Sequence, residues 1–187
     1  VKGEPFSLKV FANIINSQNY KEVIVFDAHS DVTTALIDRC NNYSNFTLVN
    51  DLLENKSNYY IVSPDSGAYK KIFKLCQQLE YEDEIILCNK NRDVKTGNIT
   101  GILCNVPDFN GRDLYIIDDI CDGGGTFIML AEELRKRNCG KINLIVSHGI
   151  FSRGIHALHN IDHIYTTDSI ENDFVDIDGK LTIINNI

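Results

Sequence analysis

The sequence has no long run of apolar residues. A helix that crosses a membrane needs about 18 to 20 consecutive apolar residues, and no stretch of this chain approaches that length. The first ten residues, VKGEPFSLKV, do not have the basic start and apolar centre of a secretory signal peptide. They do not begin with Met either, so we expect the chain to be part of a longer protein. These features predict a cytoplasmic protein with no membrane partner.

The cysteines are not arranged as metal ligands. None of the six belongs to a Cys-x-x-Cys pair, so the sequence does not support a zinc site. Cysteines that are scattered along a chain in this way are typical of a protein in a reducing cytosol.

Positive charge is also scarce. The chain has 18 basic and 26 acidic residues, and its net charge is −8. A protein of this charge repels the nucleic-acid backbone, so we expect no DNA or RNA partner. A smaller phosphate ligand remains compatible with the sequence, because Mg²⁺ and helix N-termini can hold phosphate groups locally.

Repeats, low-complexity tracts and a Pro-rich linker are absent as well. The sequence instead alternates apolar segments with amphipathic helical ones, which predicts an α/β fold with a mainly parallel central sheet flanked by helices. Residues 89–100 are polar and are expected to form a long, mobile loop. The expected strands are residues 22–27, 59–63, 84–88, 114–118, 142–147 and 163–167.

Three helices are expected between these strands. The first covers residues 7–17. The second has a predicted apolar stripe of Tyr69, Ile72, Phe73, Cys76 and Leu79. The third contains Phe127, Leu130, Ala131 and Leu134. Basic residues 135–137 and then Gly140 predict where this helix ends.

The most informative segment is LYIIDDICDGGGT, residues 114–126. It predicts a strand that ends in two acids, a glycine-rich turn and the start of a helix. Glycines let the backbone approach an anion, and the N–H groups at a helix N-terminus can then point at a phosphate. The Thr126 hydroxyl can donate to that phosphate. Asp118 and Asp119 are expected at the carboxyl edge of the sheet, where they can bind ribose hydroxyls directly or hold Mg²⁺ through water.

This segment is neither of the common nucleotide-binding loops, because it has no GKS/T and no GxGxxG. It resembles the phosphoribosyl pyrophosphate (PRPP) signature of type I phosphoribosyltransferases and PRPP synthetases. The resemblance implies that Asp118 and Asp119 bind the ribose hydroxyls. It also implies that the 5-phosphate of ribose 5-phosphate or PRPP is held by Asp122, Gly123, Gly124, Gly125 and Thr126.

Other segments resemble PRPP synthetases in particular, and they occur in the same order. VFDAHS is similar to a strand ending in Asp-x-His, VSPDSG to a VSPDxG loop, and SHGIFS to a THGxFS motif. The resemblance implies that His29 and Asp65 are ligands of Mg²⁺. It also implies that Lys90 and Arg92 are catalytic residues that clamp the phosphates of ATP. Each of these residues also has a structural interpretation. Asp is common in turns such as the one that contains Asp65. A histidine such as His29 is common at a strand end, and Lys90 and Arg92 can be solvated charges of a polar loop.

The resemblance implies a ribose-phosphate diphosphokinase that converts ribose 5-phosphate and ATP to PRPP and AMP, and it implies a homo-oligomer. Residues 1–44 are expected to be the end of a first synthetase-like domain, and residues 45–187 to be the phosphoribosyltransferase-like domain. The turn reads DGGGT where most synthetases have DTxGT. Two alternatives remain open. One is a PRPP-using phosphoribosyltransferase, and the other is a non-catalytic subunit that associates with a full-length synthetase.

Overall fold

The computed structural model describes residues 6–92, 99–170 and 179–185, with the backbone alone for Lys90, Arg92, Ile99 and Thr100. The chain divides into two compact units, Val1–Asn45 and Phe46–Ile187. The predicted boundary between residues 44 and 45 lies beside this division. That the first unit is the end of a larger domain stays a prediction. Within the described ranges, no helix is long and apolar enough to cross a membrane.

The described part of the first unit contains two helices and a small parallel sheet. Its elements are, in order, α1 (Ser7–Ser17), β1 (Val23–Phe26), α2 (Val32–Leu36) and β2 (Cys40–Tyr43). The helix and the strand predicted here are confirmed. The sequence does not predict β2, because the segment CNNY lacks the apolar residues typical of a strand.

The second unit is built on a sheet with the strand order β5-β4-β3-β6-β7-β8-β9. All neighbouring strands are parallel except β4 and β5, which confirms the mainly parallel sheet expected from the sequence. Its elements are α3 (Phe46–Leu53), β3 (Tyr59–Ser63), α4 (Ser66–Gln78), β4 (Ile86–Arg92), β5 (Ile99–Cys104), β6 (Asp113–Cys121), α5 (Gly125–Arg135), β7 (Ile142–Gly149), the short 3₁₀ helix η1 (Ile155–Leu158), β8 (His163–Thr167) and β9 (Leu181–Ile184).

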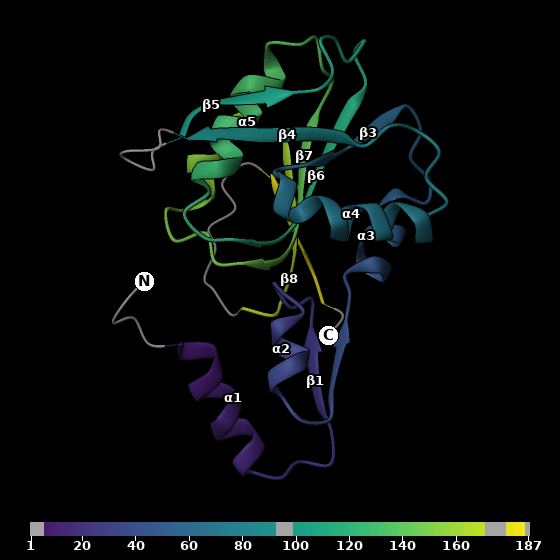
Figure 1. Ribbon diagram of the computed structural model, residues 1–187. Coiled ribbons are helices and arrows are strands. Elements are labelled where there is room, and N and C mark those ends of the chain that lie inside the picture. The colour runs from purple at the N-terminus through teal and green to yellow at the C-terminus, as the bar shows by residue number, and fades with distance from the viewer. Residues whose placement is uncertain (1–5, 93–98, 171–178, 186–187) are drawn as a thin grey trace. The chain divides into compact units, whose positions relative to one another are not determined.

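Helices cover both faces of this sheet (Figure 1). Successive side chains of a strand point to opposite faces, and β6 follows this rule. Leu114 and Ile116 pack with α5 in one core, whereas Tyr115 and Ile117 pack with α3 and α4 in the other. β6 is apolar along most of its length because both of its faces are buried.

The prediction of a long loop at residues 89–100 is wrong at both of its ends. β4 continues to Arg92, and β5 begins at Ile99 and pairs with β4 in antiparallel fashion. Cys88 lies opposite Cys104 in this pairing, with the two sulfur atoms 2.8 Å apart. The partner strand satisfies the backbone of the polar residues, so their low strand propensity does not decide the outcome. Residues 93–98 of the predicted loop lie outside the described residues.

Two helix details also differ from expectation. In α4, Ile72 and Cys76 are buried as predicted, but Tyr69 and Phe73 are exposed and stack on each other, with ring centroids 6.3 Å apart. The helix α5 ends at Arg135, and the positive backbone angle that follows it (φ 51°) belongs to Asn138.

Gly140, which was expected to end α5, has a different reason to be glycine. A Cβ atom at this position would lie 2.7 Å from the carbonyl oxygen of Gly111. The lack of a side chain is therefore required by close packing against the turn before β6, and helix capping does not depend on it.

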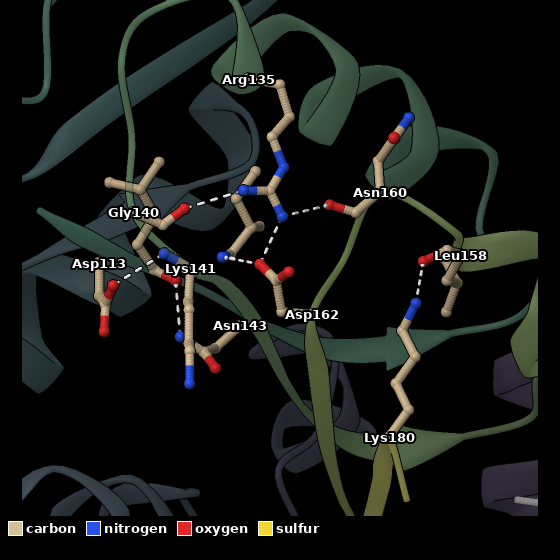
Figure 2. A network of polar contacts seen from close by, with 11 residues as sticks. Asp113, Arg135, Gly140, Lys141, Asn143, Leu158, Asn160, Asp162 and Lys180 are labelled. Atoms are coloured by element: carbon tan, nitrogen blue, oxygen red, sulfur yellow. Dashed lines mark hydrogen bonds and ion pairs between the residues drawn. The ribbon is translucent and has the colours of Figure 1, made fainter. Parts of the chain in front are cut away.

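A polar network ties together the amino ends of β6, β7 and β8 (Figure 2). Arg135 donates to the carbonyl oxygens of Gly140 at 2.8 Å and Asn160 at 3.2 Å, and it forms an ion pair with Asp162. The same Asp162 carboxylate accepts a hydrogen bond from the N–H of Ile142 at 2.6 Å. We call this the amino edge of the sheet, and it lies at the opposite end of these strands from the glycine-rich turn.

Candidate functional site

The glycine-rich turn connects the end of β6 to the start of α5. Gly124 is the residue before the helix, and its φ of 70° lies in the left-handed region that favours glycine. A Cβ at Gly124 would also lie only 2.8 Å from Cδ2 of Leu158. The N–H of Ile128 donates to the carbonyl of Gly124 at 2.9 Å, so the backbone N–H groups just before it have no partner within the helix. Such groups are the usual donors to a bound phosphate.

This turn lines a hollow of about 280 Å³. Ligand pockets usually have volumes of about 300–1,000 Å³, so this hollow lies close to the small end of that range. Both polar and apolar groups line it: Asp118, Ile120, Asp122, Gly123, Gly124, Gly125, Thr126, Phe127 and Arg153. The structure therefore brings Asp118 together with the whole predicted phosphate loop.

Asp118 is held in an unfavourable environment for a charged carboxylate. Burial raises its pKa to about 6, and the nearby charges of Asp119 and Asp65 add to this effect. A hydrogen bond from the N–H of Asp119, at 2.9 Å, and the charge of Lys71 act in the opposite direction. A carboxylate with a raised pKa that lines a hollow is a common feature of functional sites.

Asp119 has a different position from its neighbour. It is 5% exposed, and its Oδ2 atom lies 3.6 Å from Nζ of Lys71 on α4. The prediction that β6 ends at residue 118 is wrong, because pairing with β7 extends the strand to Cys121. The two acids therefore lie within a strand, where successive side chains point to opposite faces. Only Asp118 of the two lines the hollow.

The two predicted metal ligands lie in different units, and each is described by itself. Asp65 precedes α4, and its Oδ1 atom accepts a hydrogen bond from the N–H of Ala68 at 3.0 Å, which caps the helix. His29 is exposed and follows β1. Among the described residues, no three His, Cys, Asp or Glu side chains converge as metal ligands. The carboxylates of Asp65 and Asp118 still suit Mg²⁺, which usually takes one or two protein carboxylates and completes its shell with water and substrate phosphates.

The two predicted catalytic residues lie on β4. The backbone of Lys90 is opposite Ile102, and that of Arg92 is opposite Ile99, with a bulge between Asn91 and Arg92. Bulges often redirect side chains beside active sites. The side chains of Lys90 and Arg92 lie outside the described part of the structure, so their predicted roles stay predictions.

Comparison with known protein families gives this site a context. Residues 35–179 match the model of the family described as the phosphoribosyl transferase domain. The chain belongs to this family. The matched range includes the whole turn, both acids and every strand from β2 to β8.

Individual relatives of this phosphoribosyl transferase domain are named ribose-phosphate pyrophosphokinase. That of Mycoplasmopsis pulmonis is 29% identical over 90% of this chain and 54% of its own length. That of Thermoplasma volcanium is 29% identical over 99% of this chain and 64% of its own length. The chain therefore spans between about half and two thirds of the length of these relatives. The resemblance inferred from the sequence is confirmed.

A solved structure supports the fold assignment. The phosphoribosylpyrophosphate synthetase of Mycobacterium smegmatis superposes with a TM-score of 0.79 and 20% identity. The match covers 97% of this chain and 60% of the other. This likeness shows the fold of the phosphoribosyl transferase domain.

Sequence reasoning did not identify four residues of the phosphoribosyl transferase domain that belong to this region. Lys71 follows Ala68 by three positions and precedes Leu75 by four, a spacing that places it beside the buried stripe of α4. This spacing could have indicated that Lys71 lies close to the sheet. Ile120 lies inside the segment already singled out, and Phe127 follows it directly. Strand alternation beyond residue 118 would have indicated Ile120. Arg153 comes from a loop after β7, and no local pattern in the sequence marks it.

Proposed function

We propose that this chain carries the ribose-phosphate-binding part of a ribose-phosphate diphosphokinase, which makes PRPP and AMP from ribose 5-phosphate and ATP. The observation that carries the proposal is the hollow formed by Asp118 and the turn from Asp122 to Thr126 at the start of α5. The names of the relatives support the same reaction.

The hollow has the groups that a ribose phosphate requires. The N–H groups at the start of α5 and the Thr126 hydroxyl donate to the three oxygens of the 5-phosphate. The Asp118 carboxylate accepts hydrogen bonds from ribose hydroxyls. Binding a polar ligand here also provides partners for a carboxylate that is partly desolvated in the free protein. Asp119, whose Oδ2 atom lies 3.6 Å from Nζ of Lys71, is proposed as a second acceptor for the ribose hydroxyls.

The reaction itself needs little covalent chemistry from the protein. The anomeric hydroxyl of ribose 5-phosphate attacks the β-phosphorus of ATP and loses its proton. A C1–O–Pβ link forms, the bond between Pβ and the α,β-bridging oxygen breaks, and AMP leaves with that oxygen. Catalysis of such a transfer depends on alignment and on offsetting negative charge. Lys90 and Arg92 are proposed to hold the ATP phosphates during this step.

Magnesium is the proposed cofactor. When bound, Mg²⁺ neutralises charge on the triphosphate of ATP. Asp65 and His29 are each proposed as a ligand of Mg²⁺, and each is to be tested by itself.

Calorimetric titration of the 187-residue chain with ribose 5-phosphate, PRPP and Mg²⁺-ATP tests the proposal, together with an AMP-release assay. We expect ribose 5-phosphate to bind. AMP release would assign the full reaction to this chain. Binding of ribose 5-phosphate and PRPP without ATP binding or AMP release would favour a fragment or a non-catalytic partner subunit. If neither ribose phosphate binds, the proposed function is wrong.

Two variants separate binding from turnover. Thr126→Ala should remove most of the affinity for ribose 5-phosphate, because it deletes a donor to the phosphate. Lys90→Ala should lower turnover and leave that affinity nearly unchanged. A large loss of ribose 5-phosphate affinity in Lys90→Ala would mean that the role of β4 is misassigned.

We also propose that the protein assembles with further copies of itself and that it is located in the cytosol. Size-exclusion chromatography with light scattering tests the proposed assembly.

A further inference from the structure

The loop after β7 is fastened to the glycine-rich turn. The N–H groups of Ile150 and Phe151 both donate to the carbonyl oxygen of Cys121, at 2.9 and 3.1 Å. Cys121 is the last residue of β6, immediately before the turn that begins with Asp122. Any residue at the tip of this loop is therefore held at a fixed place beside the hollow.

The same loop has a backbone shape that costs energy. Phe151 has a φ of 44°, which is rare for a bulky residue, and its side chain is 4% exposed. A Cβ at Gly149 would lie 2.8 Å from Cζ of Phe151, so the ring packs where only glycine leaves room. The loop closes at Gly154, with φ 75°. Strained residues that are held by surrounding packing occur most often at ligand sites and switches.

Arg153 lies at the tip of this loop and over the turn. A Cβ at Gly123 would be 3.3 Å from Nε and 3.8 Å from Cζ of Arg153, so the guanidinium rests on the backbone of the phosphate loop. Arg153 also lines the hollow, and it is the one basic side chain among the described residues that do so. Within the described ranges, it makes no hydrogen bond or ion pair with another residue.

The charges around the hollow explain why this arginine matters. The other charged lining residues, Asp118 and Asp122, are both acidic and oppose the entry of a dianionic phosphate. A guanidinium offers two parallel N–H donors that fit two phosphate oxygens, and its charge offsets that of the carboxylates. An arginine that is already placed beside the loop needs little rearrangement to do this.

We infer that Arg153 binds the 5-phosphate of the sugar ligand together with the N–H groups of the turn, and that it selects phosphorylated over unphosphorylated ribose. This inference rests on the proposed function, because it names a further ligand of the same site. It assigns to the loop after β7 a direct part in substrate choice.

Calorimetric titration of the 187-residue chain with ribose 5-phosphate and with ribose, at fixed ionic strength, tests the inference. Arg153→Ala should weaken ribose 5-phosphate binding by about 10- to 100-fold, the range expected for losing a charged hydrogen-bonding partner. Arg153→Lys should lose less, because it keeps the charge but not the paired donors. Binding of ribose should not change. Lys136→Met is the matched control, since it removes an exposed positive charge at the far end of α5 and should leave both affinities unchanged.

The outcomes distinguish this inference from the proposed function. If Arg153→Ala binds ribose 5-phosphate as tightly as the unaltered chain while Thr126→Ala does not, the role of Arg153 is wrong and the proposed function stands. Equal losses for ribose and ribose 5-phosphate would also overturn it, because they would mean that Arg153 only supports the loop. If the unaltered chain binds no ribose phosphate, both fail. Equal melting temperatures of the variants exclude misfolding as the cause, and Arg153→Lys supplies the comparison if the alanine variant is unstable.

Discussion

The amino edge and the carboxyl edge of the large sheet, where its parallel strands begin and end, use their polar groups in opposite ways. At the amino edge, Arg135 and Asp162 bind each other and the surrounding backbone, so charge is matched and carbonyl groups have donors. At the carboxyl edge, the carboxyl group of Asp118 has a raised pKa, and Phe151 has a left-handed backbone that is rare for a bulky residue. Proteins often accept unfavourable local energy where they bind a ligand and recover stability elsewhere. We therefore predict that the amino edge contributes mainly to stability and the carboxyl edge mainly to binding.

The largest effect is expected for Gly124→Ala. An alanine in the left-handed region costs about 1–2 kcal/mol, and its Cβ would also displace Leu158. We expect ribose 5-phosphate binding to become undetectable, because the turn cannot keep its shape, and the free energy of unfolding to fall by about 2–3 kcal/mol. Calorimetry and urea unfolding measure the two effects.

The neighbouring glycine provides the control for stability. A Cβ at Gly125 would meet no atom within 4 Å, and this residue already lies in the helix. Gly125→Ala should therefore change the free energy of unfolding by less than about 1 kcal/mol. Normal ribose 5-phosphate binding by Gly124→Ala would contradict the comparison, because the backbone shape of the turn would then have no role in binding.

The next largest effect concerns Asp118 and pH. Its folded pKa of about 6 lies above the ordinary value of 3.8, so the folded state binds more protons between these two values. The contribution of Asp118 to stability should therefore be most favourable below about pH 4, fall as the pH rises to about 6, and then level off. The total change is of order 1–3 kcal/mol. Urea unfolding at a series of pH values, with Asp118→Asn as the comparison, measures it.

Asp118→Asn should remove this pH dependence. It keeps an oxygen that accepts from the N–H of Asp119 and removes the desolvated charge. We expect the variant to be more stable than the unaltered chain at pH 7 and to bind ribose 5-phosphate more weakly. A variant that is less stable at pH 7 would show that Asp118 is a structural residue, which the comparison does not allow.

A smaller effect, of the opposite kind, is expected at the amino edge. Arg135→Met removes the ion pair with Asp162 and two hydrogen bonds to carbonyl groups, but Arg135 and Asp162 are 35% and 39% exposed. Water partly replaces these contacts, so the free energy of unfolding should fall by about 1–2 kcal/mol. The dissociation constant for ribose 5-phosphate should not change. A weaker affinity in this variant would mean that the two edges are coupled.

The sequence predicts most of the main strands along the chain and the glycine-rich turn after β6, because both depend on local pattern. Apolar segments and the run DGGGT identify β6 and the turn without any knowledge of their neighbours. The different positions of Asp118 and Asp119 could not be predicted, because they depend on how far β7 extends the pairing of β6.

Residues that join the site from distant elements were the hardest to predict. Arg153 reaches Gly123 only because the loop after β7 bonds to Cys121, a contact between segments about 30 positions apart. The strand β5 was missed for a related reason, since its partner β4 satisfies its backbone. In each case a tertiary contact overrides a weak local preference.

The smallest effect is expected for Lys136→Met, one residue after Arg135. Lys136 also forms an ion pair, 2.7 Å from Glu133, but its side chain is 68% exposed and it donates to no backbone carbonyl in the described residues. Exposed pairs of this kind contribute about 0.3–0.5 kcal/mol, so urea unfolding should barely distinguish the variant from the unaltered chain. Both substitutions remove one positive charge from the end of α5, and only Arg135 bridges the starts of the strands. If Lys136→Met proves as costly as Arg135→Met, the amino edge is stabilised by overall charge in an acidic chain, and the geometry of its network is not the cause. If the two differ as expected, the stability of this edge comes from the specific bonds of Arg135.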